Sequence, residues 1–258
     1  MKKQIVILAA GKGTRMQSDL PKPLHNVTGQ SMLENALTHA FKITNDVIVV
    51  YSNYIKQHID ELKKSNPLFK KCKWAMQDPP NGTGDAVLKA LPLLATDAQV
   101  VVIYADHPFV DEKIIDAMFS QPNSQHKDNS MTLLASIQEE TSRYGRIITS
   151  EDGLVKKIVE YKDASEQERK CKLCNSAMML FASNILHQYL PEVKPSEKVN
   201  ELYLTSMVEI LVNNNKNVGY IIEDDSKYSI GVNTQEDLKK AKKILQNQSI
   251  IIGNKKLA

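Results

Sequence analysis

The chain has 258 residues, of which 42% are hydrophobic and 24% charged, and its formal net charge is +3. This length can bury a substantial core, and the fractions are ordinary for a globular protein rather than a disordered or nucleic-acid-binding one. The apolar stretch after Met1-Lys2-Lys3 is too short for an export signal, and no window approaches the roughly 20 apolar residues of a membrane span. We therefore expect a cytoplasmic protein that binds neither nucleic acid nor a membrane.

Apolar β-branched runs alternate with amphipathic stretches through the first half of the chain. The apolar runs predict strands at Ile5–Leu8, Val47–Tyr51 and Val100–Tyr104. Apolar residues at helical spacing predict helices at Ser31–Ala40, Ile55–Lys64 and Gly84–Leu94. This alternation predicts an α/β fold with a mostly parallel sheet flanked by helices. Ligands bind beyond the carboxyl ends of such strands, and Gly11 and Asp106 take that position after their runs.

Short β-like runs separated by turns dominate the second half of the chain. They cover Met131–Gln138, Gly145–Thr149, Val155–Tyr161 and Ala177–Phe181. The polar segment Lys162–Lys172 is interpreted as a loop or a short helix, and helices are expected at Leu202–Val212 and Thr234–Gln246. We interpret this part as a small β-rich subregion of mixed pairing, against which a second half of the ligand rests.

The segment Ile7–Met16 combines the end of a strand with two glycines and is the most informative motif. Gly11 and Gly13 permit positive φ and let ligand atoms approach amide N–H groups. Arg15 and Lys22 add positive charge beside those amides, a combination that suits a nucleoside triphosphate. The two glycines match neither a Walker loop nor the dinucleotide-binding fingerprint in spacing. An ordinary glycine turn with solvated lysines is the alternative interpretation.

A second glycine-rich segment, Gln77–Ala86, precedes a helical pattern. The amides of Gly82 and Thr83, with the Thr83 hydroxyl, can hold a base or a phosphate at the helix N-terminus. Gln77 offers both an amide donor and an acceptor, which match the edge of a pyrimidine. Taken alone, the segment also fits a turn followed by a helix cap.

Asp106 follows the apolar run Val100–Tyr104 and is a natural ligand for magnesium. Mg²⁺ favours one or two protein oxygens together with phosphate and water. Asn233, in the segment Ile230–Asn233, is a candidate for the second oxygen. The alternatives are a strand-end cap for Asp106 and the N-cap region of the last helix for Asn233.

Polar groups suited to a sugar are scattered over the second half. Glu160 and Asn175 are side chains of the kind that hydrogen-bond sugar hydroxyls and an acetamido group, and Gly145 leaves a bare N–H at the same surface. The segment before the last-but-one helix adds candidates for the sugar pocket or for a cap, namely Glu201, Tyr203 and Thr205. Each group alone also has a structural interpretation.

Taken in chain order, these groups resemble the uridyltransferase domain of bacterial N-acetylglucosamine-1-phosphate uridyltransferases, within the sugar-1-phosphate nucleotidyltransferase family. The resemblance covers about residues 4–235. It rests on the opening motif, Gln77 with Gly82-Thr83-Gly84, Tyr144–Ile147, Ile158–Ala164 and Gly231–Asn233. It implies a Rossmann-like nucleotidyltransferase fold, UTP and N-acetylglucosamine 1-phosphate as substrates, and Mg²⁺ held by Asp106 and Asn233.

The resemblance also implies roles for individual residues. Arg15 and Lys22 would contact phosphates and stabilise the departing pyrophosphate. The implied nucleotide-binding residues are Leu8, Ala9, Ala10, Gly11, Gly13, Gln77, Gly82 and Thr83. The implied sugar-binding residues are Gly145, Glu160 and Asn175, with Tyr203 and Thr205 as further candidates. We expect one domain over residues 1–248, with a nucleotide-binding half over about 1–110, a sugar-binding half over about 111–230, and a tail over 249–258.

Three segments depart from the family pattern. The family usually has glycine where Ala105 stands, and the added methyl is expected to narrow the space beside the metal and the nucleotide. It has Asn-Thr-Gly where Asn175-Ser176-Ala177 stands, which adds a methyl near the sugar, and aspartate where Ser206 stands. Bifunctional members continue into a left-handed β-helix acetyltransferase domain, and this chain has no such hexapeptide repeats, so acetyl transfer is not predicted.

The expected reaction is a Mg²⁺-dependent, in-line attack of the sugar 1-phosphate on the α-phosphorus of UTP, which gives UDP-N-acetylglucosamine and pyrophosphate. One alternative keeps this chemistry with another hexose 1-phosphate or with CTP. Another is a non-catalytic sugar-nucleotide sensor, or a subunit that partners a separate acetyltransferase chain. A homo-oligomer is also left open.

Overall fold

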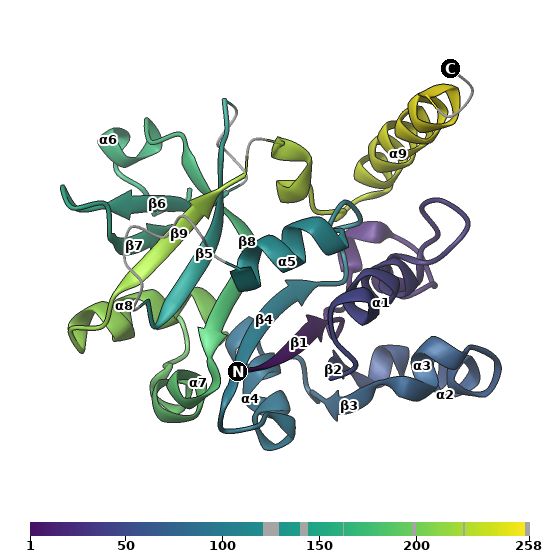
Figure 1. Ribbon diagram of the computed structural model, residues 1–258, viewed down its shortest axis with the longest axis horizontal. Helices are drawn as coiled ribbons and strands as arrows, with labels where there is room; N and C mark the ends of the chain where they lie inside the picture. Colours follow the sequence, from purple (N-terminus) through teal and green to yellow (C-terminus); the bar gives the residue numbers. More distant parts are fainter. Residues whose placement is uncertain (121–128, 140–143, 162, 198–199, 224, 256–258) are drawn as a thin grey trace.

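The computed structural model describes residues 1–120, 129–139, 144–161, 163–197, 200–223 and 225–255. The strands in this part of the chain are β1 (Lys2–Leu8), β2 (Val47–Tyr51), β3 (Lys73–Met76), β4 (Ala98–Tyr104), β5 (Met131–Ile137), β6 (Arg146–Thr149), β7 (Val155–Val159), β8 (Leu173–Ala182) and β9 (Val218–Ile222). They form one sheet whose main path runs β3-β2-β1-β4-β8-β5-β9, as Figure 1 shows.

The direction of the strands changes midway across the sheet. The pairs β3–β2, β2–β1 and β1–β4 are parallel, as is the pair β5–β9 at the other edge. Strand β8 runs antiparallel to both β4 and β5. The hairpin of β6 and β7 lies off the main path and joins it where Arg146 pairs with Cys174. The predicted parallel first half and mixed second half are confirmed.

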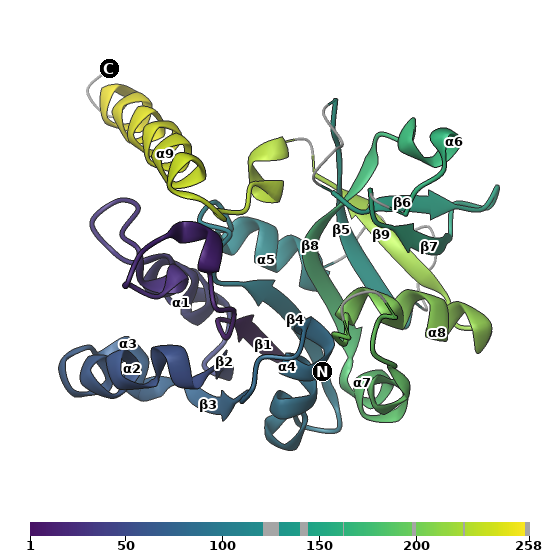
Figure 2. The same ribbon diagram turned by 180° about the vertical axis from the view of Figure 1, so that it is seen from behind.

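Helices cover both faces of the sheet (Figures 1 and 2). One face carries α1 (Met32–Ile43), α2 (Asn53–Ser65), α3 (Pro67–Lys71) and α5 (Glu112–Ser120). The other carries α4 (Thr83–Ala90), α7 (Ser183–Tyr189) and α8 (Met207–Asn213). The short α6 (Glu166–Arg169) follows the hairpin, and α9 (Gln235–Lys255) extends away from the sheet in both views. None of the helices in the described residues could cross a membrane.

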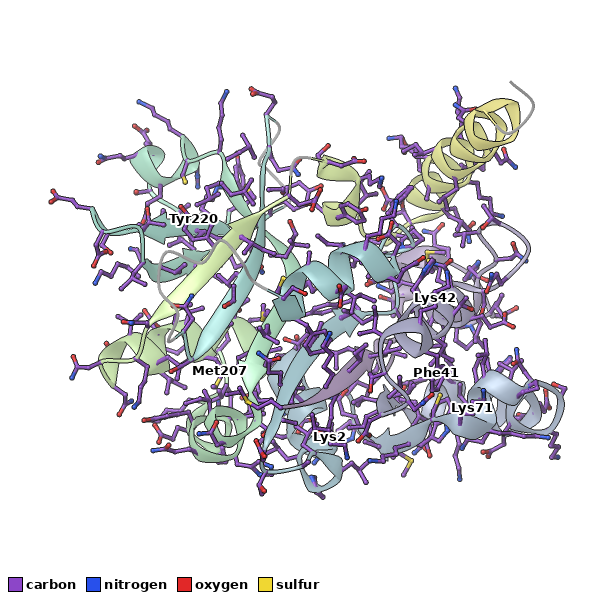
Figure 3. All side chains as sticks on the ribbon, viewed as in Figure 1. Lys2, Phe41, Lys42, Lys71, Met207 and Tyr220 are labelled. Carbon is purple, nitrogen blue, oxygen red and sulfur yellow. The ribbon has the colours of Figure 1, made fainter. Side chains whose placement is uncertain are left out.

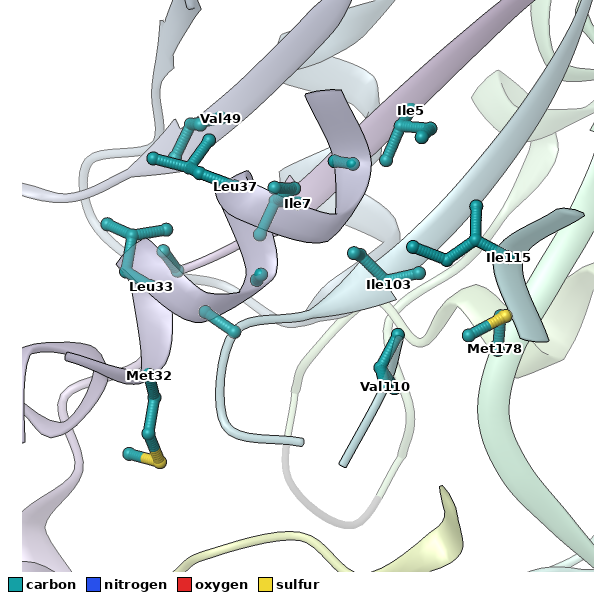
Figure 4. Close-up of a cluster of buried hydrophobic side chains, with 14 of the residues drawn as sticks. Ile5, Ile7, Met32, Leu33, Leu37, Val49, Ile103, Val110, Ile115 and Met178 are labelled. Atoms are coloured by element: carbon teal, nitrogen blue, oxygen red, sulfur yellow. The ribbon is translucent and has the colours of Figure 1, made fainter. Parts of the chain in front are cut away.

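Alternate residues of the central strands supply two separate cores, as the period of a strand requires. Ile5, Ile7 and Ile103 pack with Leu33 of α1 and Ile115 of α5 in the cluster of Figure 4. Their neighbours in the same strands pack against the opposite helices, and include Val6, Leu8, Val100 and Val102. Since both faces are covered, the central strands are apolar throughout rather than alternating.

Local contacts stabilise α1 and its packing against α3. Helix α1 begins with a capping box, in which Ser31 Oγ accepts from Glu34 N at 3.2 Å and Glu34 Oε2 accepts from Ser31 N at 2.9 Å. Lys71 of α3 reaches Phe41 of α1, with Nζ 6.0 Å from the ring centroid, and both are labelled in Figure 3. These contacts join α1 and α3 on one face of the sheet.

Several predicted boundaries differ from the structure. The helix predicted at Gly84–Leu94 ends at Ala90 and continues as a 3₁₀ turn over Leu91–Leu93, because Pro92 cannot continue an α-helix. The helix predicted at Leu202–Val212 divides into a 3₁₀ turn over Leu204–Ser206 and α8. Helix α9 continues past Gln246 to Lys255, through the segment predicted as a tail. Of the segment Lys162–Lys172, Lys162 lies outside the described residues and the rest contains α6.

Candidate active site

The motif after β1 leaves the sheet between two neighbouring strands. Ala9 N donates to Val50 O at 2.8 Å, and Ala105 N donates to Leu8 O at 3.0 Å, so the end of β1 is held on both sides. Gly13 has a φ of +63°, and a Cβ there would lie 2.6 Å from Lys22 Cβ. A Cβ on Gly11 would meet nothing within 4 Å. The packing of the protein therefore explains Gly13, whereas the space beside Gly11 is available to a ligand.

A cavity of about 560 Å³ opens at the carboxyl ends of β1 and β4. Most of the residues predicted to bind nucleotide, phosphate and metal line it, namely Leu8, Ala9, Ala10, Gly11, Gly13, Arg15, Lys22, Gln77, Gly82, Thr83, Asp106 and Asn233. Its lining also includes Lys12, Thr14, Pro23, Pro80, Ala86, Tyr104 and Glu201. The fold thus gathers at one place residues that are far apart in sequence.

The two predicted phosphate cations contact the two predicted metal ligands. Lys22 Nζ forms a short ion pair with Asp106 Oδ2 and donates to Asn233 Oδ1 at 3.2 Å. Arg15 Nη2 donates to the same Asn233 oxygen at 2.9 Å. The oxygens of Asp106 and Asn233 therefore converge on one cation, and that cation is Lys22.

Burial and neighbouring positive charges have opposite effects on the carboxyl of Asp106. Burial raises the pKa of its carboxyl, but the Lys22 ammonium and the neighbouring His107 outweigh burial, and the net effect lowers the pKa. Its second oxygen, Oδ1, is buried and accepts no hydrogen bond from the described residues, with His107 Nε2 at 3.8 Å. Asp106 therefore stays ionised at neutral pH with one oxygen left for a further cation or donor.

The start of α9 holds Asn233 in place. Asp237 Oδ2 accepts from the backbone N–H groups of Asn233 at 3.1 Å and of Thr234 at 3.0 Å. Gln235 Nε2 donates to Met16 O at 3.1 Å, which ties the same helix start to the first motif. Asn233 is thus both at a helix start, as its structural interpretation predicts, and in contact with the cations of the cavity.

Gln77 lines the same cavity and is only 2% exposed. Its Nε2 donates to Gly82 O at 2.9 Å and to Asp85 Oδ2 at 2.8 Å. Both neighbours are acceptors, so the amide orientation is determined by its partners. The expectation that Gln77 offers a ligand both a donor and an acceptor is wrong on this geometry, because both amide protons are already used.

The segment before α4 packs on the segment before α8. Gly82 has a φ of +97°, and a Cβ there would lie 2.3 Å from Leu202 O. Thr83 Oγ1 accepts from Leu204 N at 2.9 Å, and the Thr83 side chain acts to lower the pKa of Tyr104. Burial raises the pKa of Tyr104 strongly, and Asp106 and Glu160 raise it further. Tyr104 thus remains a neutral phenol between the cavity and Glu160.

The predicted sugar-binding residues are absent from the cavity lining, and Glu160 is the one among them that acts on the pKa of Tyr104. A Cβ on Gly145 would lie 3.2 Å from Glu160 Oε1, and Asn175 N donates to Gly145 O at 2.9 Å. Partial desolvation raises the pKa of Glu160, although Arg146 opposes this. Glu160 also raises the pKa of Tyr203, after desolvation and Glu201. Gly145, Glu160, Asn175 and Tyr203 are therefore neighbours.

The remaining predicted positions have varied surroundings. Thr205 and Ser206 lie in the 3₁₀ turn that precedes α8. Ala177 lies in β8, and its side chain is outside the described part of the structure. Ala105 is 1% exposed and belongs to the core shared with α1 and α5, and the cavity lining does not include it. The expectation that its methyl narrows the space beside the nucleotide is wrong, since this side chain points into the core.

Tyr104 and Asp85 contact residues of the site but had no role assigned from the sequence. Tyr104 stood in the motif with Asp106, and its place at the end of a buried strand is the signal that could have identified it. Asp85 carries only the signal of an acidic residue in the first turn of a helix, which normally indicates favourable interaction with the helix dipole. Its bond to Gln77 depends on the turn between them and could not be seen in the sequence.

The chain is similar in sequence to known proteins over most of its length. The model of a protein family described as "Nucleotidyl transferase" matches residues 4–248. The "Bifunctional protein GlmU" of Limosilactobacillus reuteri is 33% identical over 248 residues, which are 96% of this chain and 53% of that protein. The protein of the same description from Bacillus velezensis is 35% identical with the same coverage. The chain spans about half the length of the curated relatives it matches.

Solved structures with low sequence identity share the fold. A crystal structure described as a glucose-1-phosphate thymidylyltransferase from Bacillus anthracis superposes with a TM-score of 0.73 at 18% identity and covers 94% of each chain. A UDP-glucose pyrophosphorylase complexed with UDP-glucose gives a TM-score of 0.70 at 19% identity, with 96% of this chain and 100% of that chain covered. These likenesses show that the fold is shared over almost the whole chain.

Proposed function

The chain belongs to the nucleotidyl transferase family, and on that premise we propose that it transfers a uridylyl group from UTP to N-acetylglucosamine 1-phosphate. The products would be UDP-N-acetylglucosamine and pyrophosphate. The curated relatives described as "Bifunctional protein GlmU" favour this sugar over others. The proposal concerns uridylyl transfer alone.

The observation that carries the proposal is the single cavity that unites the first motif with Gln77, Asp106 and Asn233. Its volume of about 560 Å³ is in the range of pockets for small ligands. Two cations, Arg15 and Lys22, lie where a polyphosphate needs charge, and Gln77 lies where a base needs a polar partner. The cavity thus offers groups for both the base and the phosphates of a nucleoside triphosphate.

The residues present fit a magnesium ion. Asp106 and Asn233 direct oxygens at one point that a cation already occupies, and the second carboxylate oxygen of Asp106 has no hydrogen-bond partner among the described residues. Mg²⁺ takes one or two such protein oxygens and completes its shell with phosphates and water. Asp106 and Asn233 would therefore hold it, and when bound it supplies neutralisation of phosphate charge.

The chemistry needs no general base from the protein, because the attacking group is a phosphate oxygen of the sugar 1-phosphate. A bond forms between this oxygen and the α-phosphorus of UTP, and the bond from the α-phosphorus to the bridging oxygen breaks. The electron pair leaves with pyrophosphate. Arg15, Lys22 and the amides around Gly11 would bind the phosphates and stabilise charge on the leaving group. Glu160, Asn175 and Gly145 would orient the amino sugar for in-line attack.

The direct test is an assay of the purified chain with UTP, N-acetylglucosamine 1-phosphate and Mg²⁺. Pyrophosphate release and chromatographic identification of the UDP-sugar are measured together, over a panel that also contains glucose 1-phosphate and CTP. We expect the highest kcat/KM with UTP and the N-acetylated sugar. Highest activity with another sugar phosphate would replace the substrate, and nucleotide binding without turnover across the panel would favour a sensor.

Asp106→Ala should lower kcat by orders of magnitude with an unchanged circular dichroism spectrum, because the carboxylate that would hold the charge-neutralising metal ion beside the phosphates is lost. Asp116→Ala is the matched control, since Asp116 is an exposed carboxylate that pairs with Lys3 at 3.0 Å, away from the cavity. Near-normal turnover of Asp106→Ala would contradict the assignment of this cavity as the active site.

A further inference from the structure

We infer that Asp85 is a positioning residue that fixes the amide of Gln77 and so restricts the nucleotide to a base with a ring N–H, as in uracil and thymine, against cytosine. The inference rests on the proposed function and concerns the base-binding side of the same cavity. Asp85 itself is not part of the cavity lining and acts through Gln77.

The first step is the orientation of Gln77. A glutamine amide has two N–H donors and one carbonyl acceptor. Both donors are used, because Nε2 lies 2.9 Å from Gly82 O and 2.8 Å from Asp85 Oδ2. A backbone carbonyl and a carboxylate can only accept, so neither can be satisfied by the amide oxygen. Rotating the amide by 180° would place oxygen against oxygen at both contacts.

The amide oxygen of Gln77 is left to hydrogen-bond a ligand. The hydrogen bonds of the Gln77 side chain within the described residues are the two from Nε2, and none reaches Oε1. The side chain lines the cavity, so its acceptor oxygen is the atom through which it meets a base. The cavity therefore offers an acceptor, and no donor, from this side chain.

The third step is the chemistry of the bases. Uracil and thymine carry an N–H at ring position 3, which an amide oxygen can accept. Cytosine carries an unprotonated nitrogen there, so an amide oxygen in the same place meets a lone pair. A buried acceptor that loses its donor has an unfavourable desolvation energy, and sites of this kind reject the wrong analogue by large factors. CTP, which the sequence left open as an alternative, is therefore disfavoured.

Asp85 is held rigidly enough to impose this orientation. It is 9% exposed and lies in the first turn of α4, which packs beneath β1, β2 and β3. Figure 2 shows α4 on this face of the sheet. Its other oxygen, Oδ1, faces Lys89 Nζ at 3.6 Å across one helical turn. The carboxylate thus has one oxygen for Lys89 and one for Gln77.

Asp85→Asn is the decisive variant because it keeps the shape and replaces an acceptor-only group with one that can also donate. The asparagine amide can hydrogen-bond either orientation of Gln77, so a donor can now face the base. Gly82 O still opposes the rotated amide, and discrimination should therefore narrow rather than invert. We expect the ratio of kcat/KM for UTP to that for CTP to be about 100 or more in the wild type and to fall at least about tenfold in Asp85→Asn.

Lys89→Gln is the matched control. It removes the other partner of Asp85 from the same helix and leaves the bond between Asp85 and Gln77 intact, so the ratio should not change. Loss of stability alone would lower both kcat/KM values together without moving their ratio. Thermal melting of all three proteins checks that each is folded.

Two results would overturn the inference, and each is distinct from failure of the proposed function. Equal use of UTP and CTP by the wild type would show that Gln77 does not select the base. An unchanged ratio in Asp85→Asn would show that Asp85 does not set the orientation of Gln77. If no sugar phosphate is turned over, the proposed function fails, and calorimetric binding of UTP and CTP then tests the inference alone, with equal affinities contradicting it.

Discussion

Lys22 occupies the position between Asp106 and Asn233 where a metal ion would bind, and Arg15 shares the Asn233 oxygen. A cation that enters the nucleotide-free protein must first displace the Lys22 ammonium. Phosphates of a bound nucleotide would draw the same ammonium away and release both oxygens. The residues proposed to bind phosphate and those proposed to bind metal are thus in direct contact before any ligand is present.

Lys22→Met should therefore raise the affinity of the nucleotide-free protein for Mn²⁺, a paramagnetic substitute for Mg²⁺, by about tenfold, which corresponds to about 1.4 kcal/mol. Titration followed by the electron paramagnetic resonance signal of free Mn²⁺ measures this without turnover. Lys12→Met is the control, because Lys12 Nζ lies over the Tyr54 ring at 5.1 Å and lines the same cavity. Unchanged or weaker Mn²⁺ binding by Lys22→Met would contradict competition between lysine and metal.

Ala105 precedes Asp106 in the sequence, but its side chain belongs to the core and not to the cavity lining. Its methyl is buried in the core shared with α1 and α5, one residue from Asp106. Ala105→Gly should lower the free energy of unfolding by roughly 1–2 kcal/mol, from about 0.8 for the methyl and the rest from added backbone freedom. Urea unfolding measures this loss. Substrate preference over the assay panel should stay as in the wild type, and a shifted preference would restore the role expected from the sequence.

Glu112 of α5 contacts α1 on the same face of the sheet. This contact makes the packing of the two helices depend on pH. Glu112 accepts from His39 and Lys42 of α1, the latter at 3.0 Å. Its own backbone amide, Lys42 and His39 lower its pKa to about 2 from the ordinary value of 4.5, although partial desolvation opposes them. Because the folded-state pKa is lowered, the stabilisation is present above pH 4.5 and is lost as the pH falls toward 2.

Glu112→Gln should therefore reduce the free energy of unfolding at pH 7 by about 0.5–1 kcal/mol, a value reduced for solvent screening because the side chain is partly exposed. The difference from the wild type should shrink as the pH is lowered from 7 to about 3.5, by urea unfolding at each pH. Glu151→Gln, in an exposed turn, should leave both values unchanged. A difference that grows at lower pH would contradict the pairing of α1 and α5 through Glu112.

Elements with a strong periodic pattern could be predicted, and those that depend on tertiary contacts could not. The strands β1, β2 and β4 are buried on both faces and appear as continuous apolar runs. Strand β3 pairs only with β2, and of its residues only Ala75 is buried, so it gives no such run. Strand β9 contains Gly219, which interrupts its apolar pattern. Helices α5 and α7 were missed although α5 buries Ile114, Ile115, Met118 and Phe119 at helical spacing.

At the scale of the whole molecule, the sequence predicted which residues belong to the candidate site but not the contacts between them. The end of an apolar run pointed to Asp106, and Asn233 was a candidate for the second oxygen; the resemblance to a family then supported pairing these two residues, which lie far apart in the sequence. The contacts that decide what the site can do were beyond the sequence. These are the ion pair of Lys22 with Asp106, the amide orientation of Gln77, and the packing of Gly82 on Leu202. Each depends on a distance across the cavity rather than on spacing along the chain.

The cavity and the group around Glu160 draw on both halves of the sheet, so binding of nucleotide should stabilise the whole molecule and not one loop. A ligand that binds only the folded state adds RT ln(1 + [L]/Kd), about 2.7 kcal/mol at 100 times Kd. For a chain of this size this raises Tm by about 5–10 °C.

UTP with Mg²⁺ should give this shift in differential scanning calorimetry, and UTP with EDTA a smaller one, because Asp106 then faces phosphate without a neutralising ion. Asp106→Ala should make the two shifts converge. Equal shifts with and without the metal in the wild type would contradict a role for Asp106 and Asn233 in joining metal to nucleotide.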